Sequence, residues 1–183
     1  LDNHDLGRFM QKGETDLKRY KQALAFLLTT RGIPQIYYGT EILLSGTKAE
    51  GDGKIRTDFP GGWPGDARNA FTPEGRTPLE NEAWNYMKKL LNWRQHNETV
   101  KTGKLVHYTP DQTGCYVYAR VKDNKTVLVL MNGTDKDQTL DMDRFHEITD
   151  GYRSGKDILT DTTIMINHTV TIPPRGVYIL ELV

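Results

Sequence analysis

Residues 115–131, CYVYARVKDNKTVLVLM, decide the fold of the second half of the chain. From Cys115 to Val121, apolar side chains occupy every second position, with tyrosines and an arginine between them. This period of two predicts a β-strand. Asp123 and Asn124 then predict a hairpin turn that leads into a second strand.

Strand-like segments continue to the end of the sequence. Residues 127–131 are apolar on both faces, and further strands are predicted over 152–159, 169–172 and 177–182. Because these short strands follow one another, they predict a small antiparallel β-sandwich that begins after Lys104.

The first hundred residues have a helical pattern instead. Apolar residues recur at helical spacing over residues 15–31, where Thr15 caps the helix, Asp16 lies in its first turn and Gly32 ends it. Residues 33–38 are nearly all apolar, which predicts a strand buried on both faces, as in a parallel sheet. A helix followed by a buried strand indicates an α/β unit.

A long irregular segment precedes a second helix. Residues 40–76 are rich in Gly, Pro and Asp, and a loop of this length in a compact domain is commonly functional. Thr77 and Glu80 form a capping box with Pro78 at the first helical position, and the helix ends near Asn97. One stripe of this helix is predicted to face the core: Leu79, Ala83, Tyr86, Met87, Leu90, Leu91 and Arg94.

The composition excludes several classes of protein. The chain has 183 residues, with 24 Lys plus Arg and 24 Asp plus Glu, so its formal net charge is zero. Because general nucleic-acid and membrane-surface binders need a clustered excess of basic residues, this balance argues against both. The single cysteine, Cys115, excludes an internal disulfide and a multi-cysteine metal site. The sequence opens with neither Met nor a targeting peptide, and we expect it to be the C-terminal piece of a longer protein.

Three short segments carry candidate chemistry, each with a structural alternative. Residues 2–5, DNHD, offer two acceptors and an imidazole that can hold ligand hydroxyls, although a polar turn before a helix has the same composition. Asp52 and Arg56 can clamp a diol or form an ordinary exposed ion pair. The aromatic rings of residues 59–66, FPGGWPGD, either stack on sugar faces or plug the loop onto its scaffold.

Taken in order, these segments resemble the C-terminal part of the α-amylase superfamily of glycoside hydrolases. Residues 1–9, LDNHDLGRF, are similar to its last signature region, at the end of the seventh barrel strand. Residues 32–41, GIPQIYYGTE, resemble its eighth strand. Asp52 and Arg56 have the family's Asp-x-x-x-Arg spacing, and residues 55–66 look most like the neopullulanase and cyclomaltodextrinase branch.

The resemblance implies a fold of two parts, α/β followed by all-β. Residues 1–103 are expected to form the last part of a (β/α)₈ TIM barrel, from the end of strand 7 to helix 8. Residues 104–183 are expected to form a C-terminal antiparallel β-sandwich domain. The complete protein would hydrolyse α-1,4-linked glucans or maltooligosaccharides with retention, in the starch, pullulan or cyclodextrin class.

The resemblance also implies roles for four residues. Asp5 corresponds to the third invariant carboxylate, which stabilises the transition state, and His4 would bind the same sugar. Asp52 and Arg56 would bind the next glucose unit on the non-reducing side. The Asp nucleophile and the Glu acid/base of this family lie on earlier strands, outside this sequence, so the chain alone is expected to be inactive.

Partners and cofactors follow from the same resemblance. The expected partners are an α-glucan oligosaccharide and the remainder of the barrel, with neither nucleic acid nor membrane. No cofactor is required; calcium is compatible with the complete enzyme, although the sequence shows no site for it. The resemblance favours a periplasmic or secreted protein. The alternative to an incomplete enzyme is a non-catalytic carbohydrate-binding or structural module in which the β-sandwich is the working part.

Overall fold

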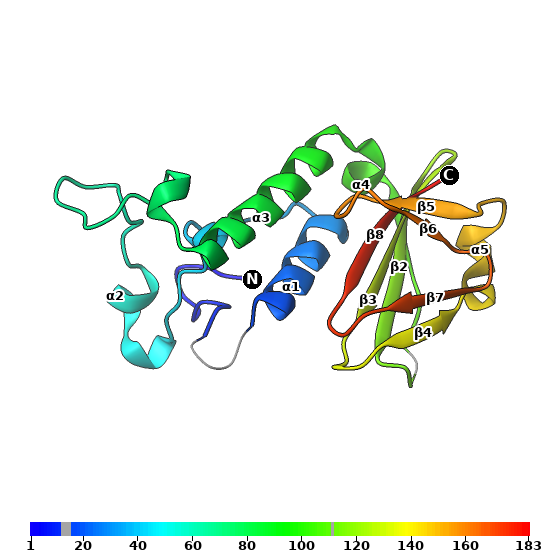
Figure 1. The fold of residues 1–183 in the computed structure, drawn as a ribbon, viewed down its shortest axis with the longest axis horizontal. Coiled ribbons are helices and arrows are strands. Elements are labelled where there is room, and N and C mark those ends of the chain that lie inside the picture. The colour runs from blue at the N-terminus through cyan, green and yellow to red at the C-terminus, as the bar shows by residue number, and fades with distance from the viewer. Residues whose placement is uncertain (12–15, 111) are drawn as a thin grey trace. The chain divides into compact units, whose positions relative to one another are not determined.

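The computed structural model describes residues 1–11, 16–110 and 112–183 (Figure 1). Thr15, the predicted helix cap, lies outside these residues. Within the described ranges, every helix is too short or too polar to cross a membrane.

The chain folds into two compact units, each built from two stretches of sequence. Unit 1 contains Leu1–Leu24 and Pro34–Lys88, and unit 2 contains Ala25–Ile33 and Lys89–Val183. The α-helices are α1 (Leu17–Thr29), α2 (Asp52–Ile55), α3 (Pro78–His96), α4 (Glu98–Thr102) and α5 (His146–Thr149). Short 3₁₀ turns lie at Thr40–Ile42, Lys48–Glu50, Pro73–Gly75 and Met142–Phe145.

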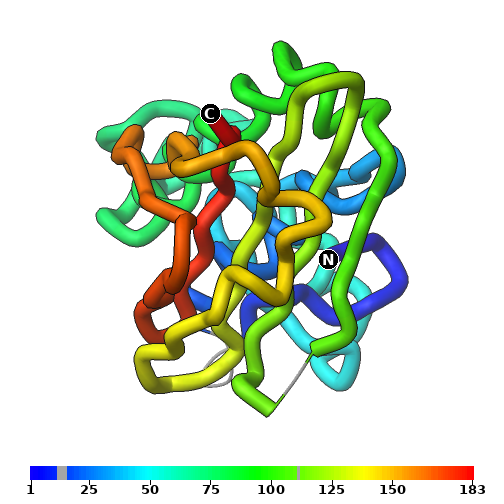
Figure 2. The backbone as a smooth tube through the Cα atoms, turned by 90° about the vertical axis from the view of Figure 1, so that its right-hand side faces the viewer, coloured from blue at the N-terminus to red at the C-terminus, as the bar shows by residue number. Residues whose placement is uncertain are grey.

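Unit 2 is a mostly-β domain with two antiparallel sheets. Its strands are β1 (Lys104–His107), β2 (Cys115–Lys122), β3 (Lys125–Asn132), β4 (Gln138–Asp141), β5 (Ser154–Asp157), β6 (Thr163–Met165), β7 (Thr169–Ile172) and β8 (Val177–Leu182). One sheet has the order β1-β2-β3-β8-β5-β6, and the other pairs β4 with β7. Figure 2 shows β1, β2, β3 and β8 side by side. A single apolar core takes buried side chains from both sheets, including Leu128, Leu180 and Ile172.

The predicted hairpin is confirmed, but its first strand is buried more completely than its pattern suggests. Lys122 pairs with Lys125 across the turn, and Asp123 has a φ of 54°. Tyr118 and Arg120, on the face opposite the core, are 0% and 1% exposed. Their polar groups form hydrogen bonds within unit 2. The hydroxyl of Tyr118 lies 2.6 Å from that of Thr29, and Arg120 Nη2 donates to the carbonyl of Gly103 at 2.7 Å.

The strand predicted over residues 33–38 is wrong for this structure, since these residues form no regular element. A parallel strand needs neighbouring strands to accept and donate its backbone hydrogen bonds. In the described part of residues 1–103, the only ladder contact is an isolated parallel bridge between Met10 and Ser45. Ile33 is therefore 98% exposed, and no βα unit of a barrel forms.

Helix α3 begins where the sequence predicts. The backbone N–H of Thr77 donates to Glu80 Oε2 at 2.7 Å, and the N–H of Glu80 donates to Thr77 Oγ1 at 3.2 Å. Within the predicted core stripe, Ala83, Met87, Leu90 and Arg94 are buried. Leu79 and Leu91 are exposed, by 58% and 37%, so the buried stripe is narrower than predicted.

Glu80 also holds the preceding loop through Arg68, so we expect its removal to destabilise unit 1. Arg68 donates to both of its carboxylate oxygens, at 2.6 and 2.8 Å. Glu80→Ala removes this fork and the capping box, and we expect the free energy of unfolding to fall by about 1–3 kcal/mol. Urea unfolding of the 183-residue chain measures it.

The contribution of Glu80 to the free energy of unfolding should depend on pH. Burial alone would raise the pKa of Glu80, but the hydrogen bonds from Arg68 and Thr77 outweigh it and leave the pKa below 4.5. A carboxyl with a lowered folded pKa stabilises the fold above its unfolded pKa, so this difference between wild type and variant should shrink as the pH falls below 4.5. Glu82→Ala is the control, because its ion pair with Lys21 is exposed and contributes about 1 kcal/mol at most. Equal losses for the two variants would contradict the assignment.

Candidate functional site

The structure brings together the four residues predicted from the sequence to form the site, His4, Asp5, Asp52 and Arg56, all in unit 1. Arg56 lies at the centre. Its Nη2 is 2.9 Å from Asp52 Oδ2 and 3.5 Å from Asp5 Oδ1, and its Nε donates to the carbonyl of His4 at 2.9 Å. Nε2 of His4 lies 3.2 Å from Asp5 Oδ2. The arrangement is a guanidinium between two carboxylates, with an imidazole beside one of them.

Local turns present these side chains to solvent. The side chain of Asn3 accepts hydrogen bonds from the backbone N–H groups of Asp5 and Leu6, both at 2.8 Å, and closes a tight turn. The side chains of His4 and Asp5 are consequently 67% and 66% exposed.

Asp52 and Arg56 meet because one helical turn separates them. Asp52 opens helix α2 and Arg56 follows its last residue, so the two side chains lie on one side of the turn at i, i+4 spacing. Lys48 donates a hydrogen bond to Asp52 from the neighbouring 3₁₀ turn. That hydrogen bond holds the pKa of Asp52 below its ordinary value, and the charge of Arg56 acts in the same direction. At neutral pH, Asp52 therefore presents carboxylate oxygens that accept hydrogen bonds.

Buried polar residues lie on the same loop as the exposed ones. The side chains of Arg8 and Asp2 are 1% and 2% exposed, and their charged groups are 3.8 Å apart. The carboxylate of Asp2 accepts the backbone N–H of Phe9 at 2.7 Å and the hydroxyl of Thr40 at 2.9 Å. From the sequence, Asp2 belongs to the segment 2–5 that can hold ligand hydroxyls, whereas Arg8 has no predicted role. The burial of Asp2 shows that it holds the loop instead, and the signal for Arg8 was its place within the 1–9 motif.

The two aromatic side chains of residues 59–66 fit different predicted roles. Phe59 packs on Phe71 with ring centroids 4.5 Å apart, which fits a plug that holds the loop. Trp63 is 65% exposed on a turn in which the carboxylate of Asp66 accepts the N–H groups of Gly61 and Trp63. Of the two aromatic rings in residues 59–66, Trp63 is the one exposed enough to stack on a ligand.

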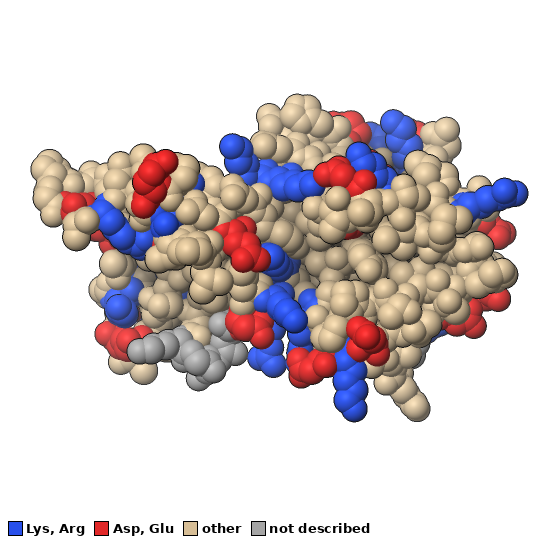
Figure 3. All heavy atoms as spheres, in the orientation of Figure 1, with Lys and Arg blue, Asp and Glu red and all other residues tan. Residues whose placement is uncertain are grey.

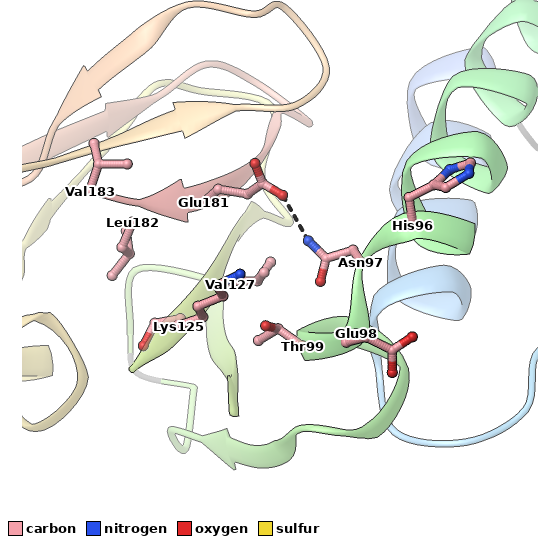
Figure 4. A pocket seen from close by; sticks show the side chains of 10 residues that line it. His96, Asn97, Glu98, Thr99, Lys125, Val127, Glu181, Leu182 and Val183 are labelled. Atoms are coloured by element: carbon pink, nitrogen blue, oxygen red, sulfur yellow. Dashed lines mark hydrogen bonds between the residues drawn. The ribbon is translucent and has the colours of Figure 1, made fainter. Parts of the chain in front are cut away.

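A hollow of about 390 Å³ lies in unit 2, lined by residues 96–99, 125–127 and 181–183 (Figure 4). Glu181 and Asn97 point toward each other across it, and the Asn97 amide donates to Glu181 Oε1 at 2.7 Å. The indole N–H of Trp93 donates to the same oxygen at 2.8 Å. Glu181 thus braces β8 against the end of α3. None of the four predicted site residues lines this hollow.

Positive and negative side chains are equal in number, 24 of each. On the face that Figure 3 shows, acidic and basic side chains are interspersed. Among the residues that the structure describes, no three His, Cys, Asp or Glu side chains are grouped closely enough to hold a metal ion.

Comparison with known proteins gives related sequences for both units. Residues 105–181 match the family model of the cyclo-malto-dextrinase C-terminal domain. A cyclomaltodextrin glucanotransferase of Thermoanaerobacterium thermosulfurigenes is 33% identical over 132 residues, which are 72% of this chain and 16% of that protein. A maltogenic α-amylase of Bacillus acidopullulyticus is 29% identical over 135 residues, 72% of this chain and 20% of that protein. The chain thus spans a fifth or less of the length of these two relatives.

Solved structures resemble the whole chain in fold. The α-amylase of Geobacillus thermoleovorans, in complex with acarbose, superposes with a TM-score of 0.76 at 22% identity. The match covers 100% of this chain and 38% of that one. A maltogenic amylase from S. marinus superposes with a TM-score of 0.68 at 20% identity and covers 99% of this chain.

Proposed function

Because the chain is a relative of the α-amylase family, with a cyclo-malto-dextrinase-type C-terminal domain at residues 105–181, we propose that its complete protein is a retaining glycoside hydrolase. Its substrates would be α-1,4-linked glucans or maltooligosaccharides. The cluster of Asp5, His4, Asp52 and Arg56 is the observation that carries the proposal. Four residues from two separate segments converge there, and their side chains are 42–67% exposed.

Asp5 would act on the sugar at which the bond is cleaved. Retaining glycosidases pass through oxocarbenium-like transition states, in which positive charge develops on the sugar ring. A carboxylate that accepts hydrogen bonds from ring hydroxyls binds more tightly as that charge develops, and such differential binding raises the rate. His4, 3.2 Å from Asp5, would donate to the same sugar. The nucleophile and the acid/base would come from parts of the protein outside this sequence.

Arg56 and Asp52 would bind the adjacent glucose unit. A guanidinium donates through several N–H groups in a fixed plane, and a carboxylate accepts through two oxygens, so the pair matches two neighbouring hydroxyls. Arg56 also touches Asp5 and the backbone of His4, so one side chain would link the two sugar sites.

The proposal includes a domain division and a set of partners. Residues 1–103 would complete a (β/α)₈ barrel, in which residues 33–38 become a strand only when neighbouring strands supply their hydrogen bonds. Residues 104–183 would be the C-terminal β-sandwich, a reading that the shared core of its two sheets supports. The partners would be an α-glucan and the rest of the barrel. The hydrolysis would require no cofactor, because carboxylates carry its chemistry.

The 183-residue chain alone should not hydrolyse maltooligosaccharides. It lacks the proposed nucleophile and acid/base, and removing groups of this kind costs several powers of ten in rate. Release of reducing sugar from maltotetraose by the purified chain, measured against a blank, checks this. Turnover above the blank would place the catalytic residues in this sequence and contradict the division of roles.

In the complete enzyme, Asp5→Asn should lower kcat far more than it raises KM. The substitution keeps the size of the side chain but removes the charge that responds to the transition state. Steady-state kinetics on maltotriose and longer substrates give both constants. Asp161→Asn is the control, because Asp161 is an exposed carboxylate of unit 2 that pairs with Lys89. A near-normal kcat for Asp5→Asn would remove its proposed role.

Arg56→Ala should mainly weaken substrate binding. Loss of a charged hydrogen bond to substrate costs on the order of 1.5–3 kcal/mol, which corresponds to a roughly ten- to 150-fold lower kcat/KM. The same kinetics measure it, and Arg175→Ala, which breaks an ion pair with Asp135 in unit 2, serves as the control. An unchanged kcat/KM would show that Arg56 forms only a surface ion pair.

A further inference from the structure

The backbone carbonyls of Ile55 and Thr57, the residues before and after Arg56, accept hydrogen bonds from side chains elsewhere in unit 1. The carbonyl of Ile55 accepts a hydrogen bond from Arg8 Nε at 2.9 Å. The carbonyl of Thr57 accepts one from the hydroxyl of Tyr38 at 3.1 Å. Arg56 and Thr57 thus lie between two anchored peptide groups, which restricts the path of the backbone at Arg56.

The two anchoring side chains are themselves joined. Arg8 Nη1 donates to the carbonyl of Tyr38 at 2.6 Å. The guanidinium carbon of Arg8 lies 4.2 Å from the ring centroid of Tyr37 and 5.1 Å from that of Tyr38. Because Arg8 is only 1% exposed, these contacts form away from water, where hydrogen bonds to a charged group and cation–π contacts are strongest.

Arg8 also belongs to the loop that carries Asp5. Its backbone N–H donates to the carbonyl of Gly46 at 2.8 Å, and Asp2, at the other end of the loop, accepts the N–H of Phe9. One buried residue therefore fixes the segment of Asp5 and the segment of Arg56 at the same time.

The ion pair between Arg56 and Asp5 contributes little to this fixation. Arg56 Nη2 is 3.5 Å from Asp5, and the two side chains are 42% and 66% exposed. An ion pair of this length and exposure is screened by water and contributes little to holding two flexible side chains. Arg56 also bonds Asp52 Oδ2 and the carbonyl of His4, both at 2.9 Å, and these bonds require that its backbone be held at the right place.

We propose that Arg8 and Tyr38 are positioning residues that set the orientation of Arg56 toward Asp5. This inference rests on the proposed function for its kinetic consequences, but its structural consequence is independent of any activity. Both side chains would act through the peptide groups of Ile55 and Thr57.

The kinetic test uses the complete enzyme. Tyr38→Phe removes one hydrogen bond and should raise KM for maltooligosaccharides about two- to tenfold, with a smaller change in kcat. Arg8→Lys keeps the charge but loses the planar fork, and misplacement of Arg56 should lower kcat/KM about ten- to hundredfold. In an Arg56→Ala background, both substitutions should lose most of their effect on KM. Effects that simply multiply with that of Arg56→Ala would contradict the proposal.

Two matched controls separate positioning from general stability. Arg76 is also a buried arginine of unit 1, stacked 4.1 Å from the Trp84 ring and donating to the carbonyl of Ala70. Tyr86 donates its hydroxyl to the carbonyl of Lys21 at 3.1 Å. Arg76→Lys and Tyr86→Phe should lower the unfolding temperature as much as the test variants do, yet leave KM unchanged. A rise in KM for the controls as large as that for the test variants would overturn the inference.

A crystal structure of the Arg8→Lys protein gives the readout that needs no activity. The proposal predicts that the hydrogen bond from Arg56 Nε to the carbonyl of His4 breaks and that Arg56 leaves Asp5. If Arg8→Lys does not fold, the Tyr38→Phe structure decides, with a displaced Arg56 expected. Both contacts retained at their wild-type distances would overturn the inference. An inactive wild-type enzyme would instead refute the proposed function alone.

Discussion

The buried guanidinium of Arg8 is the interaction on which the rest of unit 1 depends. It joins the N-terminal loop, the segment of Tyr37 and Tyr38, and the end of helix α2, which are up to 47 residues apart in sequence. Each of these segments lacks regular secondary structure or is a single turn, so none can hold its own shape. Satisfying their backbone carbonyls with one buried charge is what lets two irregular loops present a defined cluster of polar side chains.

In unit 2, buried arginines likewise donate hydrogen bonds to backbone carbonyls, here at the end of a helix. Arg120, 1% exposed, donates to the carbonyls of Thr29 and Thr30 at the end of α1 and to that of Gly103. Arg94 donates to the carbonyl of Leu28 at 2.7 Å. The last carbonyls of a helix have no partner within it, and a buried guanidinium both satisfies them and complements the negative end of the helix dipole. The face of β2 opposite the core is therefore covered rather than exposed.

The elements that depend on local sequence were predicted correctly. The hairpin at Asp123, the capping box at Thr77 and the strands at 169–172 and 177–182 each depend on residues close together in the chain, and all were confirmed. The strand over 33–38 failed because no strand lies beside it among the described residues, and the strand predicted over 152–159 is shorter, at Ser154–Asp157. The resemblance named His4, Asp5, Asp52 and Arg56, and the structure brings them together. The positioning role of Arg8 and Tyr38 was not predicted. Their hydrogen bonds to the carbonyls of Ile55 and Thr57 span 47 and 19 residues of sequence, and a local sequence pattern does not indicate contacts over such separations.

A crystal structure of the complete enzyme, inactivated at its nucleophile and soaked with a maltooligosaccharide, tests the central claim most directly. We expect sugar hydroxyls within hydrogen-bond distance of both Asp5 and Arg56, on adjacent glucose units. The guanidinium of Arg56 should keep its bond to the carbonyl of His4 in that complex. An oligosaccharide bound in the catalytic cleft without contact to Asp5 or Arg56 would contradict it.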